Sequence, residues 1–218
     1  MNIILDLETI GATDPAIIER IGANIKPPGN MKKAETIAAW AENDKPAAVE
    51  EALLKTAFDG TYGKIVCIGF AIDDKPAVAI SGDDEKHIIN RFYQSVQDAM
   101  MEPYCGPLCM IGHNLIGFDL KFLWKRSVIL GIKPPKSIPF KAKPWDAVVF
   151  DSMQEWDKDS RVSLDNLCAA LKIPTPKGEM DGSKVWDAYK AGKFEEIGNY
   201  CMGDVNATRE VYRRMTFA

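Results

Sequence analysis

The chain opens on a short apolar run that ends in two acidic residues. Residues 3–5 are Ile-Ile-Leu, which predicts a buried β-strand. Because side chains alternate faces along a strand, Asp6 and Glu8 point the same way from the strand's end. Neighbouring carboxylates in an apolar setting repel each other unless a cation lies between them, and their oxygens suit Mg²⁺ or Mn²⁺. The same pattern also fits a strand followed by a polar turn at residues 9–13. Whether Asp6 and Glu8 form a metal site therefore depends on further acids elsewhere in the chain.

The order of the remaining elements predicts an α/β fold. Apolar runs predict four further strands, of which the first two form a hairpin; they lie at residues 64–72, 77–80, 108–112 and 147–150. Helical patterns separate or follow these strands, beginning near residues 83, 118, 163, 183 and 194. The first, fourth and fifth strands can run parallel through helical crossovers. We therefore expect a mixed sheet of five strands, with room for a sixth, flanked by helices.

One part of the chain fits this scheme less well. Residues 15–25 carry apolar side chains without a clean helical period, and Pro27-Pro28-Gly29 follows them. Residues 32–44 and 46–58 predict two short helices with more charge and alanine than core helices carry. We expect residues 1–218 to form one domain, with this helical insertion at about residues 26–63 on the rim of the sheet.

Composition limits the classes of protein. The 218 residues are 46% hydrophobic and 27% charged, which suits a globular domain. A net charge of −4 argues against coating duplex nucleic acid through a large basic surface, although clustered catalytic acids lower the total in a nuclease. Local cations still offer candidate phosphate contacts or simply a solvated surface: Lys121, Lys125, Arg126, Lys133, Lys136, Lys141 and Lys143.

Cysteine usage and hydropathy indicate a compartment. The five cysteines are odd in number, and Cys105 and Cys109 lack a second pair at zinc spacing. No apolar run approaches the roughly 20 residues needed to span a bilayer, and the first residues do not form a signal peptide. We expect a reduced, cytoplasmic protein with no membrane partner.

Two further stretches supply acids. Asp119 follows the expected strand at 108–112 after a Gly-containing connection, and sites in open α/β sheets form outside the carboxyl ends of strands. Tyr200 and Asp204 are four residues apart in the last helix, so they share one helix face. A phenol beside a metal-bound carboxylate is suited to holding a water molecule in line for attack.

With these motifs the chain resembles the DEDDy-type 3′→5′ exonucleases. The matching residues are Asp6-x-Glu8, Asn114 to Phe118-Asp119, and Tyr200-x-x-x-Asp204. It is most similar to predicted exonucleases related to the proofreading domain of family B DNA polymerases. That similarity is carried by three runs: Ile111-Gly112-His113-Asn114, Ser163-Leu164 and Tyr200-Cys201-x-x-Asp204-Val205.

The resemblance implies a ribonuclease H-like fold and two divalent ions, Mg²⁺ or Mn²⁺. It implies that Asp6, Glu8 and Asp204 hold the ion that activates water. Asp6 bridges to a second ion, which Asp119 supports. Tyr200 orients the water, because a phenol with a pKa of about 10 is a poor general base at neutral pH. The other branch of the family has a histidine where this chain has Asn199.

Neighbouring residues have two readings each. Thr9 either contacts the terminal nucleotide or belongs to a turn, and Asn114 either contacts a sugar or ties down its loop. Phe118 either stacks on a base or joins the helix core. His113 is either a strand-end hydrogen bonder or a catalyst, with the first favoured, and Asp151 either supports the site from behind or caps a helix.

The sequence thus predicts a metal-dependent 3′→5′ exonuclease that releases nucleoside 5′-monophosphates. Its expected partners are single-stranded nucleic acid 3′ ends, DNA rather than RNA because of the similarity to proofreading domains. Three alternatives stay open: an RNA- or oligonucleotide-trimming enzyme, a non-catalytic nucleic-acid-binding module on the same fold, and a structural subunit of a replication or repair assembly.

Overall fold

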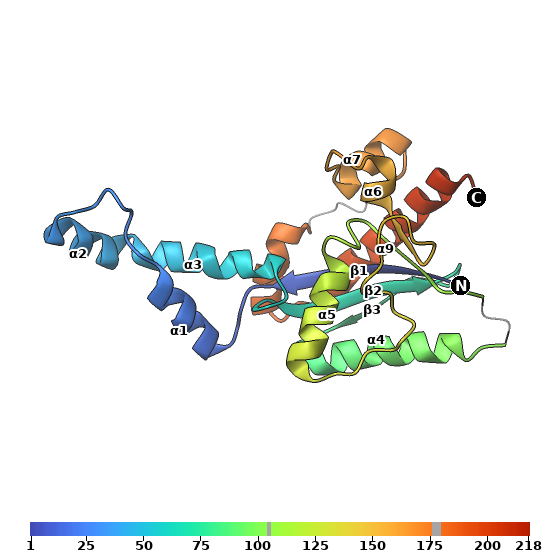
Figure 1. Cartoon of the computed structure of the whole chain (residues 1–218), viewed down its shortest axis with the longest axis horizontal. Helices are drawn as coiled ribbons and strands as arrows, with labels where there is room; N and C mark the ends of the chain where they lie inside the picture. The colour runs from blue at the N-terminus through green and yellow to red at the C-terminus, as the bar shows by residue number, and fades with distance from the viewer. Residues whose placement is uncertain (104–105, 176–179) are drawn as a thin grey trace.

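The computed structural model describes residues 1–103, 106–175 and 180–218. Cys105 and residues 176–179 of the last predicted loop lie outside the described residues. A mixed sheet forms the centre of the molecule, with helices on both faces and a group of three helices extending away from it (Figure 1). Within the described residues, no helix combines the length and apolarity needed to cross a membrane.

Five strands form the sheet in the order β3-β2-β1-β4-β5. They are β1 (Asn2–Ile10), β2 (Lys64–Ile72), β3 (Val78–Ser81), β4 (Cys109–Gly112) and β5 (Val149–Asp151). β1 pairs antiparallel with β2 and parallel with β4, β4 pairs parallel with β5, and β2 and β3 form the predicted hairpin. The mixed five-stranded sheet is confirmed. One expectation is wrong: β1 continues to Ile10, so Asp6 and Glu8 lie within it rather than at its end.

The two faces of β1 are divided between two sets of helices. Ile3, Leu5 and Leu7 pack toward α4 (Glu85–Met100) and α5 (Asp119–Leu130). Ile4 and Ile10 belong to clusters that contain residues of α9 (Phe194–Thr216). Asp6 and Glu8 alternate with the first set, so they face the α9 side of the sheet.

Several helix boundaries follow the predicted signals. The Asp84 carboxylate accepts the His87 N–H at 3.0 Å before α4, and Ser163 caps α7 (Leu164–Leu171). Gly131 ends α5 with φ at +68°, a left-handed conformation that glycine adopts without strain. In the last turn of α5, Leu130 packs against the core, whereas Ile129 is 52% exposed and lies on the outer face of the helix. The remaining short elements are α6 (Ser152–Trp156), η2 (Gly182–Lys184) and α8 (Val185–Lys190).

The projecting helices are α1 (Pro15–Asn24), α2 (Ala34–Asn43) and α3 (Lys45–Lys55), followed by η1 (Thr56–Phe58). We call residues 15–58 the helical arm; it extends to the left of the sheet in Figure 1. The two helices expected at 32–44 and 46–58 are confirmed. α1 was not expected, because none of its residues is buried and a helix without a core face needs no apolar stripe. Local signals form it instead: Asp14 accepts the Ala16 N–H at 2.8 Å and Pro15 occupies the first turn. The division into one domain with an insertion at about residues 26–63 stays a prediction.

Candidate active site

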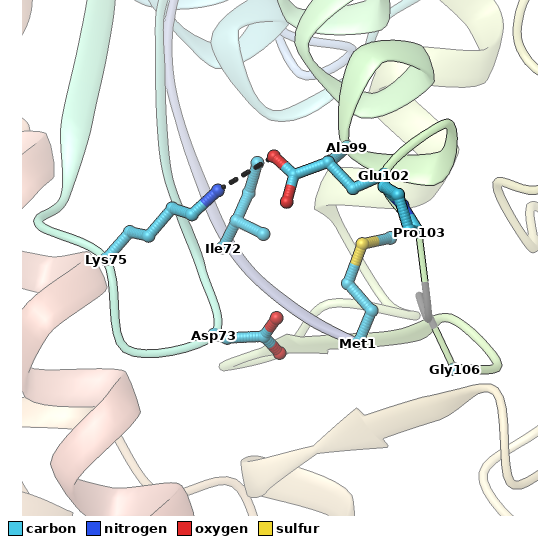
Figure 2. Close-up of a pocket in the computed structure, with 8 residues that line it drawn as sticks. All are labelled: Met1, Ile72, Asp73, Lys75, Ala99, Glu102, Pro103 and Gly106. Carbon is cyan, nitrogen blue, oxygen red and sulfur yellow. Dashed lines mark hydrogen bonds and ion pairs between the residues drawn. The ribbon is translucent and has the colours of Figure 1, made fainter.

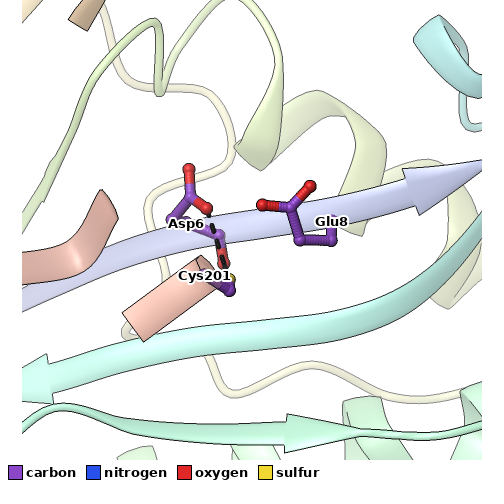
Figure 3. Close-up of side chains that lie close together, drawn as sticks. All are labelled: Asp6, Glu8 and Cys201. Carbon is purple, nitrogen blue, oxygen red and sulfur yellow. Dashed lines mark hydrogen bonds between the residues drawn. The ribbon is translucent and has the colours of Figure 1, made fainter. Parts of the chain in front are cut away.

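A bulge lies beside the first acid pair. Glu8 pairs with Cys67 of β2 and Thr9 pairs with Ile65, so Val66 is left without a partner on β1. Bulges bend a strand locally and re-aim side chains, and they are frequent near functional sites. Asp6 and Glu8 lie side by side on β1, with their carboxylates on the same side of the strand (Figure 3). The predicted orientation of this pair is therefore confirmed.

The third acid reaches β1 because β4 is short. The register pairs Ile4 with Ile111, and β4 ends one residue later at Gly112. Beyond that point the β4-facing edge of β1 has no strand beside it. Asp119, the first residue of α5, fills this position: its Oδ1 accepts the Leu7 N–H at 3.1 Å, and the side chain is only 3% exposed. The chain topology thus brings Asp119 next to the Asp6–Glu8 pair.

Helix α9 closes the other side of the site. It approaches β2 closely at Gly69, where an added Cβ would lie 2.6 Å from the Cys201 Sγ. The Cys201 thiol lies 3.3 Å from Asp6 Oδ2 and donates a hydrogen bond to it (Figure 3). Cys201 was not among the predicted site residues, so its contact with Asp6 is an addition from the structure. The available signal was its position directly after Tyr200 and one turn before Asp204.

The carboxylates of the site are held at a high electrostatic cost. Burial and the charge of Asp204 raise the pKa of Asp6 to about 8, against a smaller lowering by the Cys201 hydrogen bond. Burial, followed by the charges of Asp6 and Asp204, raises the pKa of Glu8 well above its ordinary value. Burial and the Asp6 charge raise the pKa of Asp119 in the same way. Glu8 and Asp119 are buried and Asp6 is half-buried, and these three mutually repelling acids therefore resist ionisation.

The Tyr200 phenol belongs to the same electrostatic unit. Burial raises its pKa first, and the charges of Asp204 and Glu8 raise it further. A hydrogen bond between the Tyr200 hydroxyl and the Asp204 carboxylate adds to this rise. Tyr200 and Asp204 are thus in contact on one face of α9, as their spacing predicts. The phenol keeps its proton throughout the neutral range.

The site has the composition of a cation site. Ligand atoms of Asp6, Glu8 and Cys201 lie within 4.8 Å of one another. In the described parts of the chain, no lysine or arginine forms an ion pair with Asp6, Glu8 or Asp119. Glu8 is only 7% exposed, yet its carboxylate forms no hydrogen bond with any described residue. Buried charges are normally paired or coordinate metals, so these residues fit a divalent cation.

The predicted substrate contacts are engaged in structural interactions. Thr9 lies in the strand rather than in a turn, and its hydroxyl donates to the Ala57 carbonyl at 2.7 Å. The Phe118 ring is half-buried and packs on Phe122, with ring centroids 5.5 Å apart. Asn114 takes a left-handed conformation with φ at +61°, and its carbonyl accepts the Phe118 N–H at 2.8 Å. These contacts fit the structural interpretations of Phe118 and Asn114, whereas the turn expected at Thr9 is wrong because β1 continues through it.

Two cations proposed as phosphate contacts are paired within the protein. Lys125 forms an ion pair with Asp59, and Arg126 binds Glu85 through two hydrogen bonds of 2.8 and 2.7 Å. Glu85 also accepts the Ile65 N–H at 2.8 Å, so this buried pair fastens α5 to α4 and β2. The phosphate interpretation of Arg126 is wrong, because its guanidinium is largely buried.

Asp151 and His113 support the β4–α5 connection from behind. The Asp151 carboxylate accepts the N–H groups of Asn114 and Ile116, each at 2.9 Å, and that of Met153 at 3.2 Å. It thus combines both predicted roles, because it caps α6 and holds the turn that leads to Asp119. His113 bridges the Ser152 hydroxyl at 2.9 Å and the Val162 carbonyl at 2.8 Å, as expected of a strand-end hydrogen bonder.

Two hollows lie near the ends of β1. At the base of the arm, a hollow of about 410 Å³ has a mostly apolar lining that includes Ile18, Leu53 and Trp186. A smaller one, of about 190 Å³, lies at the opposite end of β1 between Met1 and the end of α4 (Figure 2). The Lys75–Glu102 ion pair, 3.1 Å long, spans it. The hollow at the base of the arm is the one on the side of the carboxylates. Gly11, three residues after Glu8, forms part of its lining.

Comparison with known proteins places this geometry in a family. A solved structure of the family B DNA polymerase from the hyperthermophilic archaeon Pyrobaculum calidifontis aligns with 99% of this chain, at a TM-score of 0.63 and 14% sequence identity. The chain covers 24% of that polymerase, or about a quarter of its length. The likeness shows a shared ribonuclease H-like fold. No curated protein matches the sequence.

A sequence family matches residues 55–218, which include Asp119, Tyr200 and Asp204. Asp6, Glu8 and most of the helical arm precede the matched range. The match nevertheless extends over most of the chain, and it agrees with the family that the motifs resemble. The chain belongs to the family of predicted 3′→5′ exonucleases related to the exonuclease domain of PolB.

Proposed function

We infer that this chain is a metal-dependent 3′→5′ exonuclease that degrades single-stranded DNA and releases nucleoside 5′-monophosphates. The observation that carries the inference is the gathering of Asp6, Glu8 and Asp119 in one buried place without a compensating cation among the described residues. The hydrogen-bonded Tyr200–Asp204 pair stands beside them. The family supports exonuclease activity, and its relation to a DNA polymerase domain supports DNA as the substrate. We further infer that residues 1–218 act as one domain.

The acids divide into two sets of ligands. Asp6, Glu8 and Asp204 would hold one divalent ion, and Asp6 together with Asp119 would hold a second. Two such ions, when bound, stabilise the attacking and leaving oxygens of an in-line displacement at phosphorus. Mg²⁺ and Mn²⁺ both suit a site rich in carboxylate oxygens. Asp6 serves both sets, so its replacement should damage activity more than replacement of Glu8.

The chain's own groups account for water positioning. The Tyr200 hydroxyl stays protonated because burial and the neighbouring carboxylates raise its pKa. A protonated phenol cannot accept the proton of the attacking water, but it can fix the position of that water through its oxygen. Its hydrogen bond to Asp204 in turn fixes the phenol. Tyr200 is therefore a positioning group rather than a general base.

Digestion of end-labelled oligonucleotides tests the proposal. Single-stranded DNA and RNA carrying a 5′ label are incubated with the protein and Mg²⁺ or Mn²⁺, and products are resolved at nucleotide resolution. We expect stepwise shortening of DNA from the 3′ end, lost in Asp204→Asn and retained in the matched control Asp98→Asn, whose carboxylate is exposed on α4. Internal cleavage, or full activity of Asp204→Asn, would overturn the mechanism. Faster shortening of RNA would transfer the proposal to RNA.

A further inference from the structure

The segment that follows the third acid carries charge of a single sign. Between Asp119 and Asp146 the sequence contains seven cationic side chains and no acidic one, although the whole chain has a net charge of −4. Two of the seven, Lys125 and Arg126, are paired internally with Asp59 and Glu85. The other five are exposed lysines that form no ion pair with any described residue: Lys121, Lys133, Lys136, Lys141 and Lys143. This segment therefore presents an uncompensated positive charge to solvent.

Aromatic rings lie among these lysines. Trp124, on the outer face of α5, is 43% exposed, and its ring lies 5.2 Å from that of Phe140 in the loop after the helix. Trp145 is 80% exposed in the same loop. Lys121 lies one turn before Trp124 on α5, so the two side chains are neighbours. We call the set Lys121, Trp124, Phe140, Lys141, Lys143 and Trp145 the aromatic–lysine surface.

The loop part of this surface is held in place. Ile138 is buried in the core below it, and Phe140 and Ala142 pack against that core. The Lys143 N–H donates to the Asp146 carboxylate at 2.8 Å, and the Asp146 N–H donates to the Lys143 carbonyl at 2.9 Å. This turn fixes Trp145 between the two bonded residues. The exposed ring is thus presented by an ordered backbone, which reduces the entropy lost when a ligand binds.

The helical part of the surface begins next to the candidate active site, and the loop part continues from it through the Trp124–Phe140 ring contact. α5 begins at Asp119, whose carboxylate bonds to the Leu7 N–H of β1. Trp124 is five residues further along, or about 7.5 Å at a rise of 1.5 Å per residue. A strand whose 3′ end lies at the acids therefore has Lys121 and the Trp124 indole within its next few nucleotides, and the loop lysines and Trp145 further upstream. Stacking rings combined with cations are the features that bind single strands without sequence preference.

We propose that the aromatic–lysine surface binds the single-stranded nucleic acid upstream of the nucleotide being removed. The lysines contact phosphates, and Trp124 and Trp145 stack on bases. Charge decides against a protein partner with an apolar surface, because five lysines without an ion pair to any described residue lie along the same segment as the exposed rings. The inference rests on the proposed function for its direction along the strand, but the binding itself can be measured independently of hydrolysis.

Binding is measured by anisotropy of a fluorescent single-stranded DNA of about 20 nucleotides, without divalent ions and at several salt concentrations. The variants are Trp145→Ala and the double variant Lys141→Glu/Lys143→Glu, all at exposed positions. We expect Trp145→Ala to weaken binding at least about fivefold, the low end for one lost stacked base. The double variant should reduce the salt slope by about 1.4, because each phosphate contact to a single strand contributes about 0.7.

Matched controls separate the surface from general effects. Lys86→Glu changes an exposed charge on α4, and Phe217→Ala removes a ring that is 95% exposed at the C-terminus. Both should bind DNA as the parent chain does. Unchanged binding in Trp145→Ala and in the double variant would overturn the proposal, and so would equal losses in the controls. Self-association that these substitutions abolish, without DNA binding, would instead identify a protein interface and also overturn it.

A second substrate distinguishes failure of this proposal from failure of the proposed function. The p-nitrophenyl ester of thymidine 5′-monophosphate offers the catalytic site a phosphodiester without an upstream strand. We expect the double variant to raise the KM for the oligonucleotide and to leave hydrolysis of the ester unchanged. An equal loss on both substrates would overturn the assignment of the surface. If the parent chain hydrolysed neither, the exonuclease proposal would fail, and the anisotropy result would still decide whether the surface binds DNA.

Discussion

Replacing Asp6 with asparagine should stabilise the metal-free protein. Asp6 interacts electrostatically with three other acids: Glu8, Asp119 and Asp204. Its pKa rises from 3.8 to about 8. Between these two values the folded protein keeps a proton that the unfolded chain has lost. The folded state is therefore favoured at the acidic end of this window, and its free energy of unfolding falls as the pH rises toward 8. Asparagine has nearly the same shape and cannot ionise.

The size of the effect follows from the shift. One pKa unit corresponds to about 1.4 kcal/mol, so the titration of Asp6 alone costs about 4 kcal/mol of stability near pH 7. The Asp6→Asn substitution removes this cost and also removes one charge that raises the pKa values of Glu8 and Asp119. The variant alters the hydrogen bond from the Cys201 thiol, whose acceptor in this pH window is the protonated Asp6 carboxyl, and this offsets part of the gain. A net gain of about 2–4 kcal/mol remains, or roughly 5–15 °C in Tm for a chain of this length.

Thermal unfolding in a chelating buffer measures this gain. The parent chain and Asp6→Asn are compared at about pH 5 and pH 7.5, both inside the window between 3.8 and about 8 in which the stability of the parent depends on pH. We expect the parent to lose stability between these values and Asp6→Asn to lose less. Added Mn²⁺ should raise the Tm of the parent and have little effect on the variant, because a bound ion stabilises only the state that holds it. Asp98→Asn is the control. A metal-free variant less stable than the parent near neutral pH would refute the electrostatic argument.

Three other substitutions test separate parts of the structure. Tyr200→Phe should lower kcat by about 10²-fold while preserving the Mn²⁺-dependent rise in Tm, because the phenol positions water and is not a ligand; a lost metal response would contradict this role. Gly69→Ala should destabilise the protein by about 1–3 kcal/mol in urea unfolding, because its Cβ would lie 2.6 Å from the Cys201 Sγ. Glu85→Ala should cost about 3–5 kcal/mol, because it leaves the buried Arg126 unpaired; normal stability would show that water replaces the carboxylate.

The predictable parts of the fold are those in which local pattern and tertiary role agree. The run 64–72 is apolar after Lys64 because β2 is buried on both faces, and its predicted limits equal the observed strand. The α4 cap at Asp84 and the end of α5 at Gly131 are local signals that tertiary packing leaves in place. The pairing of Tyr200 with Asp204 follows from helix geometry alone. The α/β sheet and the family were predictable because the strand patterns and the acidic motifs are local features of the sequence.

Other features depend on contacts that no local pattern encodes. Cys201 looks like one more apolar residue of the α9 stripe, and its contact with Asp6 arises only because Gly69 lets the helix approach β2. The pairing of Arg126 with Glu85 joins two helices far apart in sequence, so a candidate phosphate contact proved to be a structural one. α1 was not predicted because a helical period of apolar residues arises where one face of a helix is buried. None of the residues of α1 is buried.

The helical arm separates the first acid pair from the rest of the site in sequence, yet the two ends of the arm meet at β1. The Thr9 hydroxyl donates to the Ala57 carbonyl and the Ala12 N–H donates to the Thr56 hydroxyl, each at 2.7 Å. Gly11 packs so closely on α3 that an added Cβ would lie 2.5 Å from the Leu53 carbonyl oxygen. Because the chain leaves and returns at one fixed point, the length of the arm adds little to the cost of closing it. Its outer helices can therefore vary without displacing Asp6 or Glu8, whereas changes at its base should reach the candidate active site directly.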